Sequence, residues 1–205
     1  MKTGVILFGN VILLFFASCA PSSLSPEKYK SWVESESHGL KVKKDVGDFT
    51  FTFQFKPLPY IALIESRDLN VKETFIQKRT NEMAGMQYFT LTITSKDRKE
   101  ILASHAASES EYYDRLQYLV ADAQNDISLI QGKDTLPCKL YHFERDYGIS
   151  PNAKLLLGFE SAKGDQEKEN KVLLFDEKIL GGGRIFMAIN ASDINKLPQL
   201  KLNGI

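Results

Sequence analysis

The sequence has little cysteine and histidine, and neither sign of charge predominates. Its 205 residues include two cysteines and three histidines, and 26 basic side chains balance 26 acidic ones. The histidines at positions 38, 105 and 142 have no second His or Cys at metal-ligand spacing, which argues against a metal site. The alternative is a metal site assembled from histidines that are distant in the sequence. The concentrated basic surface of a nucleic-acid-binding protein is also missing. We therefore expect no metal site, no cofactor and no nucleic-acid partner.

The common catalytic motifs are missing as well. Three glycines at 181–183 precede Arg184 without the Lys-Ser/Thr ending of a phosphate loop, and predict a hairpin turn. No G-x-S-x-G motif is present, so nothing indicates a serine hydrolase of that type. Two groups of acidic residues are predicted to be solvated: Glu109 with Glu111, and Asp165 with Glu167 and Glu169. Such carboxylates would serve a glycosidase only if two of them faced each other across a cleft of about 5–10 Å. We assign no catalytic residue.

Long hydrophobic runs are confined to the N-terminus. Lys2 precedes an apolar run over residues 5–16, which Gly9 and Asn10 interrupt. Such a run is shorter than the roughly 20 residues that a membrane-spanning helix needs, and it matches the hydrophobic region of a signal peptide. We therefore predict a signal peptide over residues 1–18 and no transmembrane helix in the remaining chain.

The end of this run, Phe16-Ala17-Ser18-Cys19, resembles the lipobox of bacterial lipoproteins. The resemblance implies cleavage before Cys19 and attachment of acyl chains, such as palmitate, to that residue. Cleavage after Ala20 is the alternative, although Pro21 directly after that bond argues against it. In similar lipoproteins of bacteria with two membranes, a residue other than Asp after the cysteine, here Ala20, implies delivery to the outer membrane. The lack of an acidic cluster after Cys19 favours the periplasmic side.

The remaining chain is expected to form one domain. Residues 19–25 are predicted to be an acylated cysteine and a flexible tether, and residues 26–205 a single globular domain. A domain of this size buries roughly 70% of its extended surface, which suffices without disulfides or metals. Because lipidation uses Cys19, Cys138 has no partner for an internal disulfide, and its apolar surroundings predict a buried, inert thiol.

In the first half, helices and strands alternate. Ser25 and Pro26 predict the start of a helix that ends near residue 36. Phenylalanines at every second position of residues 49–55 predict a strand, with residues 40–42 as its hairpin partner. A phenylalanine row that stacks a ligand is the alternative. Further predicted elements are helical segments within 60–76, a strand at 86–95, a pairing segment at 101–102 and a helix at 108–117.

The second half is predicted to be almost entirely strands. Alternating apolar residues predict a long strand over 119–131, which returns as a second strand over 135–145. Further strands are expected at 155–159, 172–175 and 184–190, and Ser192-Asp193 is predicted to cap a final turn. The fold class that follows is α+β and strand-rich: an antiparallel β-sandwich-like domain of about eight strands, with helices mainly in the first half.

The lipobox, the tether and the long hairpin at 125–147 loosely resemble uncharacterised Bacteroidota lipoproteins, which have no assigned activity. We expect a lipid-anchored envelope protein, attached to the membrane through its acyl chains, that binds or scaffolds another envelope component. The alternatives are a lipid-anchored hydrolase and a carrier of an apolar ligand. A scaffold requires an exposed apolar patch, a hydrolase a cleft with converging titratable groups, and a carrier a cavity between the sheets.

Overall fold

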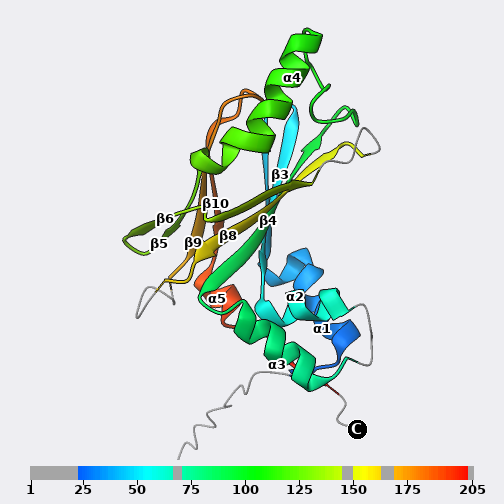
Figure 1. The fold of residues 1–205 in the computed structure, drawn as a ribbon, viewed down its shortest axis with the longest axis vertical. Coiled ribbons are helices and arrows are strands. Elements are labelled where there is room, and N and C mark those ends of the chain that lie inside the picture. The colour runs from blue at the N-terminus through cyan, green and yellow to red at the C-terminus, as the bar shows by residue number, and fades with distance from the viewer. Residues whose placement is uncertain (1–22, 67–70, 145–149, 163–168, 203–205) are drawn as a thin grey trace, which may run out of the picture.

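Two antiparallel sheets form the centre of the molecule, and helices cover its two ends (Figure 1). The computed structural model describes residues 23–66, 71–144, 150–162 and 169–202. We refer to the end covered by α4 (Glu109–Gln117) as the upper end and to the opposite end as the lower end. The fold is strand-rich α+β, as the alternating pattern predicts.

The larger sheet has five strands in the order β2-β3-β4-β8-β7. The phenylalanine alternation lies in its second strand, where Phe49, Phe51 and Phe53 are buried and the threonines between them face outward. The hairpin partner of this strand is the one expected from the sequence. The strands are β2 (Lys41–Val46), β3 (Phe49–Lys56), β4 (Met86–Ser95), β8 (Asn152–Glu160) and β7 (Leu140–Glu144).

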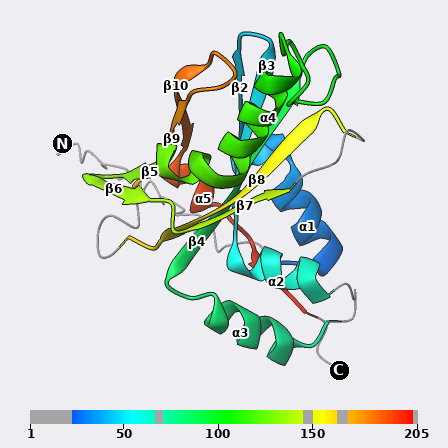
Figure 2. The same cartoon turned by 45° about the horizontal axis from the view of Figure 1, so that its top comes forward.

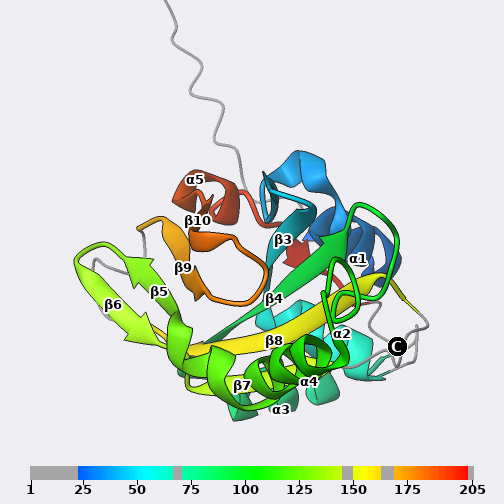
Figure 3. The same ribbon diagram turned by 90° about the horizontal axis from the view of Figure 1, so that it is seen from above.

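The smaller sheet has four strands in the order β10-β9-β5-β6 and packs face to face against the larger one (Figure 3). Its inner side chains, such as Leu129, Leu173 and Ile185, join Phe51 and Phe53 in one buried cluster. This shared core makes the arrangement sandwich-like. The strands are β10 (Gly183–Ile189), β9 (Lys171–Glu177), β5 (Ile127–Gln131) and β6 (Asp134–Pro137).

A second, smaller core lies at the lower end, where helices pack around Tyr29, Val33 and Tyr60 (Figure 2). No helix among the described residues is long and apolar enough to cross a membrane. The elements at this end are β1 (Ser23–Leu24), α1 (Pro26–Glu34), the 3₁₀ turn Glu36–His38, α2 (Leu58–Ser66), α3 (Glu73–Glu82), α5 (Ala191–Ile194) and β11 (Gln199–Leu200).

The prediction of a strand from residue 119 is wrong for its first half. Helix α4 continues into a π-helical turn, Tyr118–Asp122, and a 3₁₀ turn, Ala123–Asp126, before β5 begins. Leu119 and Ala123 are both buried four positions apart, which is a helical spacing that the i, i+2 pattern conceals. Residues 101–102 do not pair as a strand either, because they lie in a buried turn.

The predicted strand at 135–145 is two strands in different sheets. β6 pairs with β5 in the smaller sheet, whereas β7 pairs with β8 in the larger one. The chain crosses between them after Pro137, where the Cys138 N–H donates to the Ile127 carbonyl and the Lys139 N–H to that of Gly158. The long hairpin at 125–147 is therefore a short hairpin followed by a change of sheet, and residues 145–149 lie outside the described part.

Three predicted element ends also differ. Ser23 and Leu24, expected in the tether, form β1 and pair in parallel with β11, so these two residues belong to the folded domain. The Ser25 side chain makes no capping hydrogen bond in the described structure, although its carbonyl accepts from the Tyr29 N–H. Asn190 occupies the N-cap position of α5, so the Ser192-Asp193 pair lies inside this helix.

Candidate interaction surface

The strands of the smaller sheet are apolar on both faces. In β9, Leu173 and Phe175 point into the core, and Val172 and Leu174 alternate with them on the opposite side. Antiparallel sheets with one solvated face normally alternate apolar and polar residues, whereas a nearly continuous apolar run is typical of strands covered on both faces. The composition of this strand therefore indicates that its outer face is covered.

The strand register aligns these outward residues in two rows across the sheet. One row is Phe186, Leu174, Ser128 and Pro137, and the next is Ala188, Val172, Ile130 and Thr135. Side chains directly opposite on neighbouring strands lie within contact distance. The eight residues form one surface, which we call the outer sheet face.

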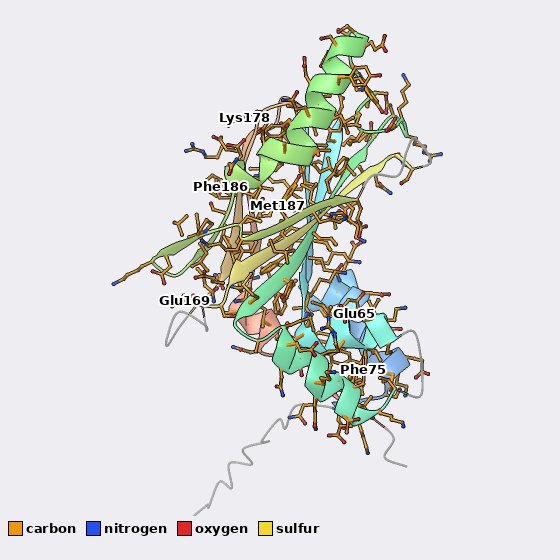
Figure 4. The ribbon with its side chains drawn as sticks, viewed as in Figure 1. Glu65, Phe75, Glu169, Lys178, Phe186 and Met187 are labelled. Atoms are coloured by element: carbon orange, nitrogen blue, oxygen red, sulfur yellow. The ribbon has the colours of Figure 1, made fainter. Side chains whose placement is uncertain are left out.

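Phe186 is the most prominent apolar side chain of the outer sheet face. Its side chain is 47% exposed, whereas the adjacent Met187 is buried in the core, so the two lie on opposite sides of β10 (Figure 4). Arg184 and Asp176 border the face toward the upper end, with 3.6 Å between Arg184 Nε and Asp176 Oδ1. An aromatic residue in an apolar area with a charged rim is typical of protein interfaces.

A serine, aspartate and histidine cluster at the upper end has the composition of a hydrolase site but not its geometry. The Asp97 carboxylate accepts hydrogen bonds from the hydroxyls of Ser95 and Ser104, and its Oδ2 lies 3.6 Å from His105 Nε2. These bonds, that from Ser95 above all, lower the pKa of Asp97 to about 2. Both serines are buried and face the carboxylate, so neither is positioned for activation by the imidazole. The cluster fixes the loop after β4.

The histidines and Cys138 do not form a metal site. No group of three metal-ligating side chains occurs among the described residues. His38 stacks on Trp32 and bonds its backbone carbonyl, while His142 is exposed on β7. Cys138 is buried as expected, its thiol donates to the Leu140 carbonyl, and burial is the main cause that raises its pKa to about 11. Such a thiol is a poor nucleophile at neutral pH.

Among the acidic groups Glu111 has a structural role, and the glycine run forms a turn. Glu111 accepts from the Ala107 N–H and Ser108 accepts from the Glu111 N–H, and these two bonds cap the start of α4. Glu109 and Glu169 are exposed, whereas Asp165 and Glu167 lie outside the described residues. The glycines at 181–183 connect β9 to β10 as the predicted hairpin turn.

The phenylalanine row on β3 belongs mainly to the core. Phe51 and Phe53 are fully buried and pack with side chains of the opposing sheet, where a carrier would need its cavity. Phe55 is partly buried and lies at the lower end of the core. Cys19 and the predicted signal peptide at residues 1–18 lie outside the described residues.

Sequence reasoning missed the outer sheet face. The signal was present in the runs Val172-Leu173-Leu174-Phe175 and Ile185-Phe186-Met187-Ala188, which are apolar at consecutive positions. By themselves, such runs predict only strands. Their meaning depends on which neighbours align the outward residues, and that information comes from the strand register.

Comparisons with known proteins add no assigned function. No protein-family model and no curated protein matches the chain. One similar solved structure is a novel protein of unknown function from Burkholderia pseudomallei, with 15% identity over 85% of this chain and 93% of that one, and a TM-score of 0.38. Another is a DUF4426 family protein from Pseudomonas aeruginosa, with 8% identity over 74% of this chain and 92% of that one, and a TM-score of 0.36.

Proposed function

We propose that this protein is a lipid-anchored component of the bacterial cell envelope that binds another envelope protein through its outer sheet face. The observation that carries the proposal is the apolar outer side of a four-stranded sheet, with Phe186 about half exposed at its edge. A contiguous apolar surface is costly to leave in water, and on a monomer it typically marks an interaction site. The resemblance of residues 16–19 to a lipobox supports the location.

The position of β1 supports an orientation in which the outer sheet face points sideways from the membrane. Only three residues lie between Cys19 and Ser23, and the four steps along the chain correspond to about 14 Å at full extension. Ser23 pairs with β11 at the lower end, beside the helical core. Acyl chains on Cys19 would therefore hold the lower end near the bilayer. The outer sheet face would remain available to a partner on the same outer-membrane surface.

We favour a protein partner over a lipid surface because of how the face is built. Its apolar residues lie on a sheet of regular register, and an arginine–aspartate pair borders them. A flat apolar centre with a mixed polar rim matches the usual division of a protein interface into core and rim. The hydrolase alternative gains no support from the serine, aspartate and histidine cluster described above.

The anchor is tested by Cys19→Ser. This change removes the thiol to which the diacylglyceryl group would be attached, so incorporation of labelled palmitate should fall to background and the protein should leave the membrane fraction or remain unprocessed. Cys138→Ser is the matched control and should retain full labelling, because Cys138 is buried in the core. Unchanged labelling of the Cys19 variant would refute the anchor.

The partner is tested by placing a photo-crosslinking benzoylphenylalanine at Leu174 in cells. We expect a discrete adduct with a different protein, because Leu174 lies within the outer sheet face. The same probe at Thr92, on the outer side of the larger sheet, is the control and should give no such adduct. The adduct should disappear when Ala188→Lys places a charge in the face. An adduct only with lipid, only with a second copy, or equally at Thr92 would contradict the proposal.

A further inference from the structure

The helix at the upper end of the molecule exposes apolar side chains to solvent (Figure 1). Tyr113 on α4 is 57% exposed, and Val120 in the π-helical turn that continues α4 is 59% exposed. No other large hydrophobic side chain of the described residues is exposed as much. Seven positions span about two helical turns, so both lie on the side of the helix that faces away from the core. We call this side the upper helix face, and its exposed apolar and charged residues are Glu109, Tyr113, Asp114, Val120, Ala121 and Asp122.

The two apolar residues do not stabilise the helix that carries them. Valine and tyrosine are weaker helix formers than alanine, glutamate or lysine, because their side chains lose rotamer freedom against the preceding turn. Burial could offset this cost, but neither Tyr113 nor Val120 contributes to the two buried clusters of the described structure. Since neither the helix nor the core requires them, these residues indicate contact with another molecule. Their place next to a π-helical turn agrees with this, because such turns are frequent at functional sites.

The opposite side of the helix is fixed to the body of the protein. Arg115 is buried, and its guanidinium donates to the Ser104 carbonyl and to the Glu111 carboxylate, both at 2.6 Å. Leu119 is buried in the core, and its carbonyl accepts from the Tyr141 hydroxyl on β7. The helix is thereby attached to the loop after β4 and to the larger sheet. A surface held in one orientation loses little conformational freedom on binding, which favours affinity.

The exposed charges of the upper helix face are all acidic. Arg115 is the only basic residue of α4 and its π-helical turn, and it is buried in an ion pair with Glu111. Lys178 acts electrostatically on Asp122 from β9's end of the molecule, but its ammonium is bonded to Asp126 at 2.6 Å. The three acids of the upper helix face form no salt bridge in the described part of the chain. Their charges are therefore available to a partner.

We propose that the upper helix face docks into an apolar groove of a basic protein, with Tyr113 and Val120 as anchors. Helices that bind in grooves use apolar residues at i, i+3, i+4 and i+7, and these two residues have the i, i+7 spacing. Lysine and arginine side chains around the groove would pair with the three acids, which fixes the orientation and speeds association. Anionic lipid head groups would repel the acids, and so would the same face of a second copy. The surface is separate from the outer sheet face and requires neither that interface nor the lipid anchor.

Docking is tested by placing the photo-crosslinking residue benzoylphenylalanine at Tyr113 in cells that produce the full-length protein. We expect one discrete protein adduct, and mass spectrometry should find lysine or arginine beside the cross-linked residue of the partner. The same probe at Gln77, an exposed position of α3 at the lower end, is the control and should not give this adduct. The proposal is overturned if no protein adduct forms at Tyr113, or if the adduct contains only lipid, a second copy or a partner segment without basic residues.

The charge requirement is tested by Asp114→Lys in the protein with the probe at Tyr113. The reversed charge should lower the yield of the adduct at least about fivefold, because a like charge then faces the basic groove. The melting temperature should not change, since Asp114 is exposed, so that the loss reflects docking and not unfolding. Glu27→Lys, which makes the same exchange at an exposed position of α1, is the matched control and should retain the full yield.

Salt provides a second measurement of the same requirement. Raising the salt concentration in permeabilised cells should weaken the Tyr113 adduct, because salt screens exposed charge pairs. An adduct that persists undiminished in the Asp114→Lys variant or at high salt would show that charge does not select the partner, and would refute the proposal.

Discussion

The outer faces of the two sheets differ in composition although both sheets contribute to the same core. On the larger sheet, the outward positions of β3 and β4 carry Thr50 opposite Thr94 and Thr52 opposite Thr92. On the smaller sheet, the equivalent positions carry Phe186 opposite Leu174 and Ala188 opposite Val172. Since strand propensity alone accepts either composition, the difference reflects the surroundings of each face. Threonine suits a face in contact with water, and the apolar rows suit a face covered by a partner.

The largest effect should come from the inner side of the larger sheet. Phe53 is fully buried and stacks on Phe89 with 4.9 Å between ring centroids. Phe53→Ala should lower the free energy of unfolding by about 3–5 kcal/mol, because it leaves a cavity. The neighbouring Thr52→Ala, on the outer side, should change it by less than about 1 kcal/mol. Denaturant unfolding measures both, and equal effects would mean that the inner and outer assignments are wrong.

A smaller but sharper contrast is expected between two adjacent leucines of β9. Leu173 is fully buried, so Leu173→Ala should destabilise the protein by about 2–4 kcal/mol. Leu174→Ala should cost about 1 kcal/mol or less in the purified protein, because the Leu174 side chain is partly exposed when no binding protein covers the outer sheet face.

The comparison of these leucines depends on the partner being absent. If Leu174→Ala destabilised the purified protein as much as Leu173→Ala does, the chain itself would cover the outer sheet face, and the proposed interface would be lost. Addition of the cross-linked partner should instead raise the stability of the unmodified protein more than that of the Leu174→Ala variant, since ligand binding stabilises the folded state.

The strands with strict alternation could be predicted from sequence because a single buried face imposes a period of two. This holds for β3 and β4, where aromatic and aliphatic residues alternate with threonine. Between residues 118 and 126 the same spacing misleads, because Leu119, Ala121 and Ala123 lie on helical turns. The local pattern does not distinguish a strand from a helix when the buried positions fit both the strand period of two residues and the helical period of 3.6.

The candidate sites depend on contacts that no local pattern contains. The sequence pattern begins β9 only at residue 172, and the pairing of β9 with β5 is what aligns Lys171 with Gln131. Gln87 and Gln131 come from different sheets and are 44 positions apart in the chain. The crossing from β6 to β7 also depends on tertiary structure, since Pro137 indicates only an irregularity. Chemistry assembled from several strands therefore becomes visible only in three dimensions.

On the outer face of the larger sheet, burial disfavours the charged form of Lys56. Lys56 Nζ bonds Gln54 Oε1 at 2.9 Å and lies 4.9 Å from the centroid of the Tyr60 ring. Burial lowers the pKa of Lys56 from 10.5 to about 8, with smaller contributions from Lys154 and Lys41. The folded protein therefore releases this proton at lower pH than the unfolded chain.

This difference gives stability a defined dependence on pH. Between pH 8 and 10.5 the Lys56 side chain binds more protons in the unfolded chain than in the folded protein. The contribution of Lys56 to the free energy of unfolding therefore rises with pH in this range and is smallest below pH 8. Lys56→Met should raise the free energy of unfolding at pH 7 by about 1–2 kcal/mol and flatten its rise between pH 7 and 9.5. The exposed Lys139→Met should leave the rise intact. A Lys56 variant that keeps the full pH dependence would show that another group causes it, and that this part of the polar face carries no buried charge.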